Sequence, residues 1–197
     1  MGGDKRFIER LDSLFTMDLP AKYYEKTEDI TQEGLMGNYG HGNEPSQHIP
    51  YLYMWTSQPW KTQYRLREIM DRMYRNNIDG LCGNDDCGQM SAWYIFSAMG
   101  FYPVCPGTDQ YVLGAPYLPY IKVMLENGKT FEVKADKVSD KNRYVKSVKL
   151  NGKPYTKGFI TQQDIMDGGT LTFEMTSSPN KKRVFNGTDR PYSLSSN

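Results

Sequence analysis

The chain has 197 residues, with 24 Lys and Arg against 23 Asp and Glu and a formal net charge of +1. This balance gives no electrostatic reason to expect a nucleic acid or an anionic membrane surface as a partner. The mean hydropathy is -0.68, which suits a soluble protein. No apolar run approaches the ~20 residues that a membrane-spanning helix needs.

The first residues, MGGDKRFIERLDSLF, lack the uninterrupted apolar stretch of a signal peptide. If the protein is exported, we expect its signal to lie outside this sequence. The apolar residues fall at i, i+4, i+7 and i+8, which predicts an amphipathic helix over residues 4–15 with Asp4 as its cap. They are Phe7, Leu11, Leu14 and Phe15.

A Gly- and Pro-rich stretch follows, MDLPAKYYEKTEDITQEGLMGNYGHGNEP, which we interpret as a structured loop. Pro45 suits the first turn of a second helix, over about residues 45–56. A third helix is predicted over residues 59–76 by its apolar stripe. That stripe consists of Leu66, Ile69, Met70 and Met73.

The next segment is an acidic loop, GLCGNDDCG, followed by a helix over residues 87–99. The helix sequence, QMSAWYIFSAM, is nearly apolar all round, which predicts burial. Gly100 is a suitable helix stop, and Pro103 prevents continuation.

After residue 103 the pattern changes to short, partly alternating runs: YIKVML, KTFEVKA, VKSVKL, PYTKGFIT and GTLTFEM. The segments ENGK, LNGK and DGGT lie between them and are typical of tight turns, and KVMLENGKTFEV is the clearest hairpin. We expect mostly antiparallel strands over about 110–176, then a partly loose polar tail. The fold class is therefore α+β, a helical half followed by an antiparallel β half.

Three cysteines are too few for a disulfide framework. Cys82 and Cys87 flank the acidic loop, and Cys105 follows later. A zinc site would need two further ligands, and the only imidazoles available are His41 and His48. We expect buried free thiols or one loop disulfide rather than zinc.

Two loops, over residues 41–48 and 83–89, have many polar residues just before a helix. Capping of the helix N-terminus explains either loop taken alone. A cap needs only one oxygen, however, whereas each loop offers several oxygens beside glycines that permit close approach. Such oxygens could surround Ca²⁺, and a remaining carboxylate could activate water. Trp55, Trp60 and Trp93 could line the rim of this site or fill the core.

Two blocks carry a resemblance to a known family. They are HGNEPSQHIPYLYMWTSQPWKTQ and GLCGNDDCGQMSAWYIFSAMGFYPVCPGTDQYVLGAP, in this order within residues 35–120. They resemble signature blocks of the calcium-dependent exo-α-mannosidases of glycoside hydrolase family 92. The resemblance implies an (α/α)6 toroid with an accompanying β-sandwich, a bound Ca²⁺ that contacts mannose hydroxyls, and hydrolysis with inversion.

The resemblance covers only the C-terminal portion of such an enzyme. It implies that residues 1–105 are the last helices of the toroid and that residues 106–197 form an antiparallel β domain. Asp86 matches the general base of the family, with Asp85 beside it, and Asn84 stands where some members have an acid. The general acid, an N-terminal β-sandwich and the remaining helices would lie upstream, so the fragment alone is expected to be inactive.

The remaining assignments from the resemblance concern the metal and the sugar. Asn43 and Glu44 correspond to the block near the calcium and are assigned as metal ligands. Glu44, Asn84 and His41 are assigned as substrate contacts.

The implied reaction is the removal of terminal α-linked mannose, of α-1,2 type, from glycans such as N-glycans. The implied location is the periplasm or the cell exterior. The alternatives are a carbohydrate-binding or structural module that performs no chemistry, and a helical scaffold with capped ends and no site.

Overall fold

The computed structural model describes residues 2–18, 20–23, 25 and 34–194, and all statements below concern these residues. The expected loop after the first helix falls partly outside them. The α-helices are α1 (Gly3–Thr16), α2 (Trp60–Met73), α3 (Gln89–Met99) and α4 (Gln162–Met166). The 3₁₀ helices are η1 (Ala21–Tyr23), η3 (Glu44–Ser46), η4 (Ile49–Trp55) and η5 (Gly187–Asp189).

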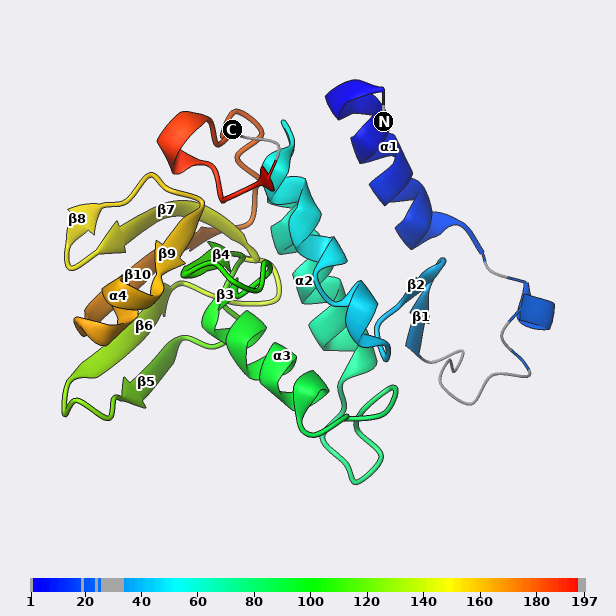
Figure 1. Ribbon diagram of the computed structural model, residues 1–197, viewed down its shortest axis with the longest axis horizontal. Helices are drawn as coiled ribbons and strands as arrows, with labels where there is room; N and C mark the ends of the chain where they lie inside the picture. The colour runs from blue at the N-terminus through cyan, green and yellow to red at the C-terminus, as the bar shows by residue number, and fades with distance from the viewer. Residues whose placement is uncertain (1, 19, 24, 26–33, 195–197) are drawn as a thin grey trace.

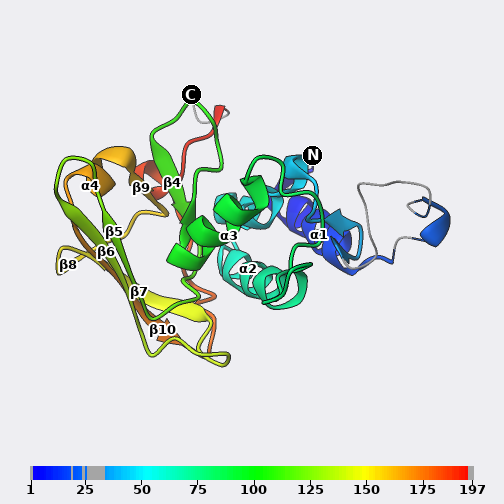
Figure 2. The same cartoon turned by 90° about the horizontal axis from the view of Figure 1, so that it is seen from below.

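The described strands form three sheets. A two-stranded sheet pairs β1 (Leu35–Met36) with β2 (Tyr39–Gly40). A three-stranded sheet has the order β3 (Phe101–Tyr102), β4 (Gln110–Leu113), β9 (Phe159–Thr161). The largest has the order β5 (Tyr120–Met124), β6 (Thr130–Asp136), β10 (Gly169–Thr176), β7 (Tyr144–Leu150), β8 (Lys153–Pro154). Figures 1 and 2 show this sheet at one end of the molecule and α1 toward the other, with α2 and α3 between them.

The helical half follows the apolar stripes of the sequence. Ile8, Leu11 and Phe15 of α1 are buried, and all four residues of the α2 stripe are buried as well. The segment over 45–56 is helical but forms two 3₁₀ pieces, η3 and η4, instead of one α-helix. In α3, Trp93 is fully buried, whereas Ile95 is 57% exposed, so burial on all sides does not hold within this chain.

The largest sheet is mixed, whereas the sequence predicted an antiparallel one. β10 pairs antiparallel with β7 but parallel with β6. The reason is topological: β6 and β7 run in opposite directions, and β10 inserts between them after a long excursion through β8, β9 and α4. A strand in that position must run parallel to one neighbour.

The turn segments behave largely as the sequence predicts. ENGK connects β5 to β6, with Met124 opposite Thr130. LNGK connects β7 to β8 through Asn151 and Gly152, which have φ of 52° and 78°. DGGT instead connects α4 to β10.

Two hydrophobic cores meet at α3. Trp93 and Ala98 pack with the helical core, while Met99 joins the core of the β half. Gln63 of α2 also accepts a hydrogen bond from the backbone N–H of Val145 in β7, at 2.9 Å. The halves are therefore packed together, and the division near residue 105 stays a prediction. No helix in the described part of the chain is long and apolar enough to cross a membrane.

The tail after β10 is more ordered than its composition suggests. Phe185 is 7% exposed and belongs to the helical core. The indole N–H of Trp55 donates to the carbonyl of Pro191 at 3.1 Å, and Arg190 donates to the carbonyl of Trp55 at 3.0 Å. The prediction of a loose tail is therefore wrong for this stretch.

Candidate active site

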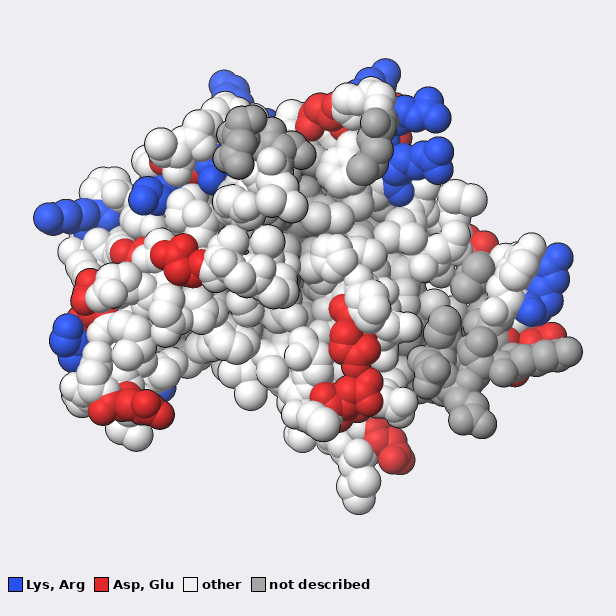
Figure 3. Space-filling view, viewed as in Figure 1, with Lys and Arg blue, Asp and Glu red and all other residues white. Residues whose placement is uncertain are grey.

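The two polar loops of the sequence lie against each other, joined by a pair of glycines. A Cβ atom added at Gly83 would lie 2.6 Å from the Cα of Gly42, and one at Gly42 would lie 3.0 Å from the Cα of Gly83. Any side chain at Gly83 would force the loops apart. In Figure 3, acidic side chains gather on the face of the molecule where these loops lie, at the ends of α2 and α3.

Asp85 holds the start of α3. Its Oδ1 accepts the backbone N–H of Ser91 at 3.0 Å, and both carboxylate oxygens lie 3.1 Å from the Ser91 hydroxyl, which can donate to either. Its carbonyl accepts the N–H of Gln89 at 2.6 Å. Asp85 therefore satisfies donors that the helix itself leaves unpaired. For this residue the capping explanation is correct.

The carbonyl of Asp86 lies 3.3 Å from the same Gln89 N–H, but its side chain does not share the capping role. Its φ is 44°, in the left-handed region that non-glycine residues rarely adopt, and its side chain is exposed. Its carboxyl group forms a hydrogen bond with Glu44 of the other loop, and this contact is the main reason that the pKa of Asp86 is raised. Desolvation and the negative charges of Glu44 and Asp85 raise the pKa of Asp86 further, because adjacent carboxylates repel each other.

A buried amide pair connects the loops behind the carboxyl groups. Nε2 of Gln89 donates one hydrogen bond to Oε1 of Gln47, at 3.0 Å. It donates a second to the hydroxyl of Tyr102, also at 3.0 Å. The indole N–H of Trp93 donates to the carbonyl of Gln47 at 2.9 Å. These contacts fix the segment that carries Glu44 relative to α3.

The comparisons with known proteins identify the family of this chain. Residues 1–177 match the model of the glycosyl hydrolase family 92 catalytic domain. The chain belongs to glycosyl hydrolase family 92. It is similar to a family GH92 α-mannosidase of Bacteroides thetaiotaomicron, with 46% identity over 98% of this chain and 24% of that one and a TM-score of 0.87.

Two further proteins are similar to this chain. A family GH92 inverting mannosidase from the same bacterium is 41% identical, with a TM-score of 0.83 over 99% of this chain and 27% of that one. An uncharacterized secreted glycosidase of Arthroderma benhamiae is 29% identical over 87% of this chain and 20% of its own length. This family 92 chain thus spans about a quarter or less of the proteins that it matches.

Of the residues assigned from the sequence, His41 lies deepest. It is 0% exposed, and its ring nitrogens lie 2.8 Å from the Tyr39 hydroxyl and 2.7 Å from the Tyr74 hydroxyl. Burial lowers its pKa to about 3. With both nitrogens occupied below the surface, the side chain has no atom to offer a sugar. The structure gives His41 a packing role in place of the expected substrate contact.

The oxygen donors of this family 92 chain fit a hard cation in part. Glu44 and Asp86 are two crowded carboxyl groups, and Asn43 begins η3 with an exposed side chain that forms no cap hydrogen bond. A proton or a cation between the carboxyl groups would relieve their repulsion. No group of three or more His, Cys, Asp or Glu side chains that could hold a metal occurs among the described residues. The chain would therefore supply only some of the ~6–8 oxygens that Ca²⁺ takes.

Other candidates from the sequence lie elsewhere or play other parts. Trp93 belongs to the core, and Trp55 contacts the tail. Cys82 is buried and Cys87 is exposed, and the structure forms no disulfide bond between them, so the loop disulfide is not formed. Asn84 is exposed beside the two aspartates, where a ligand could reach it.

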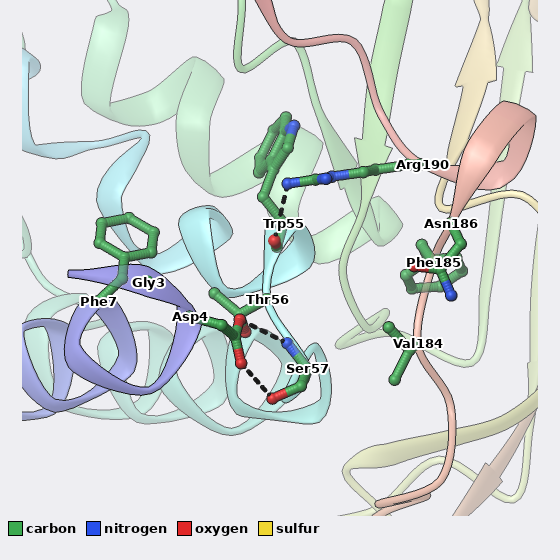
Figure 4. A pocket seen from close by; sticks show the side chains of 10 residues that line it. All are labelled: Gly3, Asp4, Phe7, Trp55, Thr56, Ser57, Val184, Phe185, Asn186 and Arg190. Carbon is green, nitrogen blue, oxygen red and sulfur yellow. Dashed lines mark hydrogen bonds between the residues drawn. The ribbon is translucent and has the colours of Figure 1, made fainter. Parts of the chain in front are cut away.

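A pocket of about 650 Å³ lies away from this site in the family 92 chain. Figure 4 shows it between the start of α1, the segment Trp55 to Ser57, and the tail. Asp4 accepts the N–H of Ser57 at 3.0 Å and its hydroxyl at 2.6 Å. Asp4 therefore ties α1 to the start of α2 and is not the expected cap, a position that Gly2 occupies.

Sequence reasoning missed Ser91, Gln47, Gln89 and Tyr102. The spacing from Asp85 to Ser91 is six residues, whereas a capping box spans three. A local motif could not have indicated it. The glutamines gave only a weak signal, as polar residues flanking the two loops.

Proposed function

We propose that the protein to which this chain belongs is a glycoside hydrolase that removes terminal α-linked mannose from glycans with inversion, and that this chain supplies the base side of the site. The observation that carries the proposal is the position of Asp86. It projects from a left-handed turn, its side chain takes no part in capping, and it faces a carboxyl group of the second loop. The names of the similar solved structures, α-mannosidase and inverting mannosidase, support the same reaction.

Asp86 acts as the general base. In an inverting glycosidase the two carboxyl groups are ~6.5–9.5 Å apart, so that a water molecule fits between the base and the sugar. Asp86 takes a proton from this water molecule while the oxygen of the water attacks the anomeric carbon. The oxygen of the leaving group takes a proton from a general acid. That acid lies on another part of the polypeptide, so this chain alone is inactive.

Glu44 has two tasks in this proposal, as a sugar contact and, with Asn43, as a ligand of Ca²⁺. A bound Ca²⁺ would be an ion that the hydroxyl oxygens of the sugar can ligate. Within the chain, Glu44 sets the protonation of Asp86 through their direct contact. Asn84 contributes an amide that can hydrogen-bond a sugar hydroxyl.

The finer points of the proposal are the α-1,2 linkage and a location in the periplasm or outside the cell. A secreted glycosidase among the relatives supports export. The other partners of this chain are the remaining toroid helices and the N-terminal β-sandwich of the same polypeptide. Assays on α-1,2-, α-1,3- and α-1,6-linked mannobiose test the linkage directly.

The decisive experiment is Asp86→Asn in the full-length protein, assayed on mannobiose. The amide keeps the size of the side chain but cannot accept the proton, so we expect kcat to fall by about 10²–10⁴-fold. The melting temperature should stay within a few degrees of the unchanged protein, because the side chain of Asp86 caps no helix and its carbonyl is unaffected by the change. NMR of the first product should show the anomer opposite to that of the substrate.

Two outcomes would contradict the proposal. If Asp86→Asn retains more than about a tenth of kcat, Asp86 is not the base. If the unchanged protein binds mannosides without turning them over, the binding module is favoured.

Metal removal tests the second part. Exhaustive EDTA treatment of the full-length protein should abolish turnover, and added Ca²⁺ should restore it. Glu44→Gln and Asn43→Ala should each raise the Ca²⁺ concentration needed for half-maximal recovery, because each removes an oxygen ligand or its charge. Lys181→Ala, on the exposed tail, is the control and should leave that concentration unchanged. Full turnover after chelation would refute the metal assignment.

A further inference from the structure

The turn that carries Asp86 is unusual in its backbone. Three consecutive residues, Asp86, Cys87 and Gly88, have φ of 44°, 59° and 92°. For the two non-glycine residues a left-handed conformation is strained, because Cβ approaches the following carbonyl oxygen. Such a turn persists only where its surroundings fix it.

The side chain of Asp86 cannot fix the turn. It is exposed, and it hydrogen-bonds to Glu44 on another loop. Both Asp86 and the thiol of Cys87 lie on the surface. The constraint must therefore come from the residues on either side of the turn.

On one side, α3 provides a rigid support. Met90 and Trp93 are 0% exposed, and the Gln89 side chain is held by Gln47 and Tyr102. On the other side, Asp85 reaches across the turn to this support. Its carboxylate holds the N–H and hydroxyl of Ser91, and its carbonyl holds the N–H of Gln89.

We propose that Asp85 is a positioning residue whose bonds to Ser91 close the left-handed turn and so aim Asp86 at the reacting water. This inference rests on the proposed function, because it takes Asp86 as the base. It replaces the direct catalytic role that the sequence suggested for Asp85. Oδ1 of Asp85 accepts the Ser91 N–H, and the single hydroxyl proton of Ser91 can go to either oxygen, so this carboxylate is engaged with the first turn of α3.

A double-mutant cycle in the full-length protein tests the proposal with Asp85→Ala, Ser91→Ala and the double variant. Loss of the anchor lets the turn relax, and a misplacement of ~1 Å in an active site can cost about 10²-fold. We expect Asp85→Ala to lower kcat by roughly 10- to 100-fold with little change in KM. Ser91→Ala should lower it less, since the N–H remains. The double variant should be no worse than Asp85→Ala alone, because both changes break one connection.

The conservative variant separates positioning from proton transfer. In Asp85→Asn the amide oxygen still accepts the Ser91 N–H, so most of the rate should remain. If Asp85→Asn loses as much kcat as Asp85→Ala, or if the losses at Asp85 and Ser91 add independently, the positioning role is wrong. Ser91→Ala and Asp85→Asn keep the test valid if Asp85→Ala fails to fold.

A cap elsewhere in the chain provides the matched control. Thr161 caps α4 in a capping box with Asp164, away from the site. Thr161→Ala should lower the melting temperature, as the loss of a cap does, with kcat unchanged. A comparable loss of kcat in Thr161→Ala would show that reduced stability alone explains the Asp85 variants. Failure of the proposed function would be visible separately, as an active Asp86→Asn protein.

Discussion

His41 shows how a single residue type can mislead. Histidine beside Asn and Glu in a polar loop suggests a ligand or a sugar contact, yet both of its ring nitrogens face tyrosine hydroxyls inside the core. Nothing in the local sequence shows this, because Tyr74 is 33 residues away. Asp86 and Glu44 were assigned from the sequence and do lie together. The family resemblance could place the charged residues but not the buried ones that hold them.

The burial of His41 makes a pH-dependent prediction. Its pKa is about 3 in the fold, against the ordinary histidine value of 6.5, so the unfolded chain binds the proton first and stability is lost as pH falls below 6.5. Between pH 6.5 and 5 the loss from this residue is about 2 kcal/mol. A cation near Asn43 would lower the pKa of His41 further, because its charge repels the protonated ring.

Urea unfolding of the full-length protein and of His41→Gln at pH 7 and pH 5 measures this loss. Glutamine takes no proton, so His41→Gln should be less stable at pH 7 but should lose less between the two pH values. Other titrating groups affect both proteins alike and cancel in the difference. Equal losses would mean that His41 is protonated within the fold.

At the level of elements, the periodic segments were predictable and the directions were not. The stripe of α2 and the turns of ENGK and LNGK are local patterns, and the structure confirms them. The stripe of α1 is confirmed in part: Leu11 and Phe15 are buried, whereas Phe7 and Leu14 are partly buried against the same core. The parallel pairing of β6 with β10 depends on which gap β10 enters, and that choice is made by long-range packing. The Asp4 cap failed for a related reason, since Asp4 bonds to Ser57, a residue 53 positions away.

Gly100 was predicted to end α3, and its surroundings make that prediction testable. It has φ of 96°, and a Cβ there would lie 3.0 Å from Cδ of Pro116. Gly152 has φ of 78° with nothing within 4 Å, so it provides a control that isolates the backbone cost. We expect Gly152→Ala to cost ~1 kcal/mol and Gly100→Ala distinctly more, measured by urea unfolding. Equal costs would show that the contact with Pro116 relaxes freely.

For the whole molecule, the tail is what the sequence concealed. Its composition is polar, but the apolar side chain of Phe185, which follows the last strand of the β half in the sequence, packs into the helical core. Its ring lies near Gly158, where an added Cβ would be 3.1 Å from Cγ of Phe185. The last described segment therefore contacts two distant parts of the chain. Pro191 accepts a hydrogen bond from Trp55 at the end of η4, and Phe185 packs beside Gly158, just before β9.

Phe185→Ala tests whether this packing stabilises the molecule. Truncating a buried phenylalanine costs ~3–5 kcal/mol, whereas the neighbouring Val184→Ala, 42% exposed, should stay within about 0.5 kcal/mol. Denaturant unfolding of the full-length protein gives both values. Trp55 contacts the tail backbone and should become more exposed in Phe185→Ala, which fluorescence quenching can detect. If Phe185→Ala is as stable as Val184→Ala, the tail packs on the helical core without adding to its stability. The packing of the two halves would then depend on α3 and on the hydrogen bond from Val145 to Gln63.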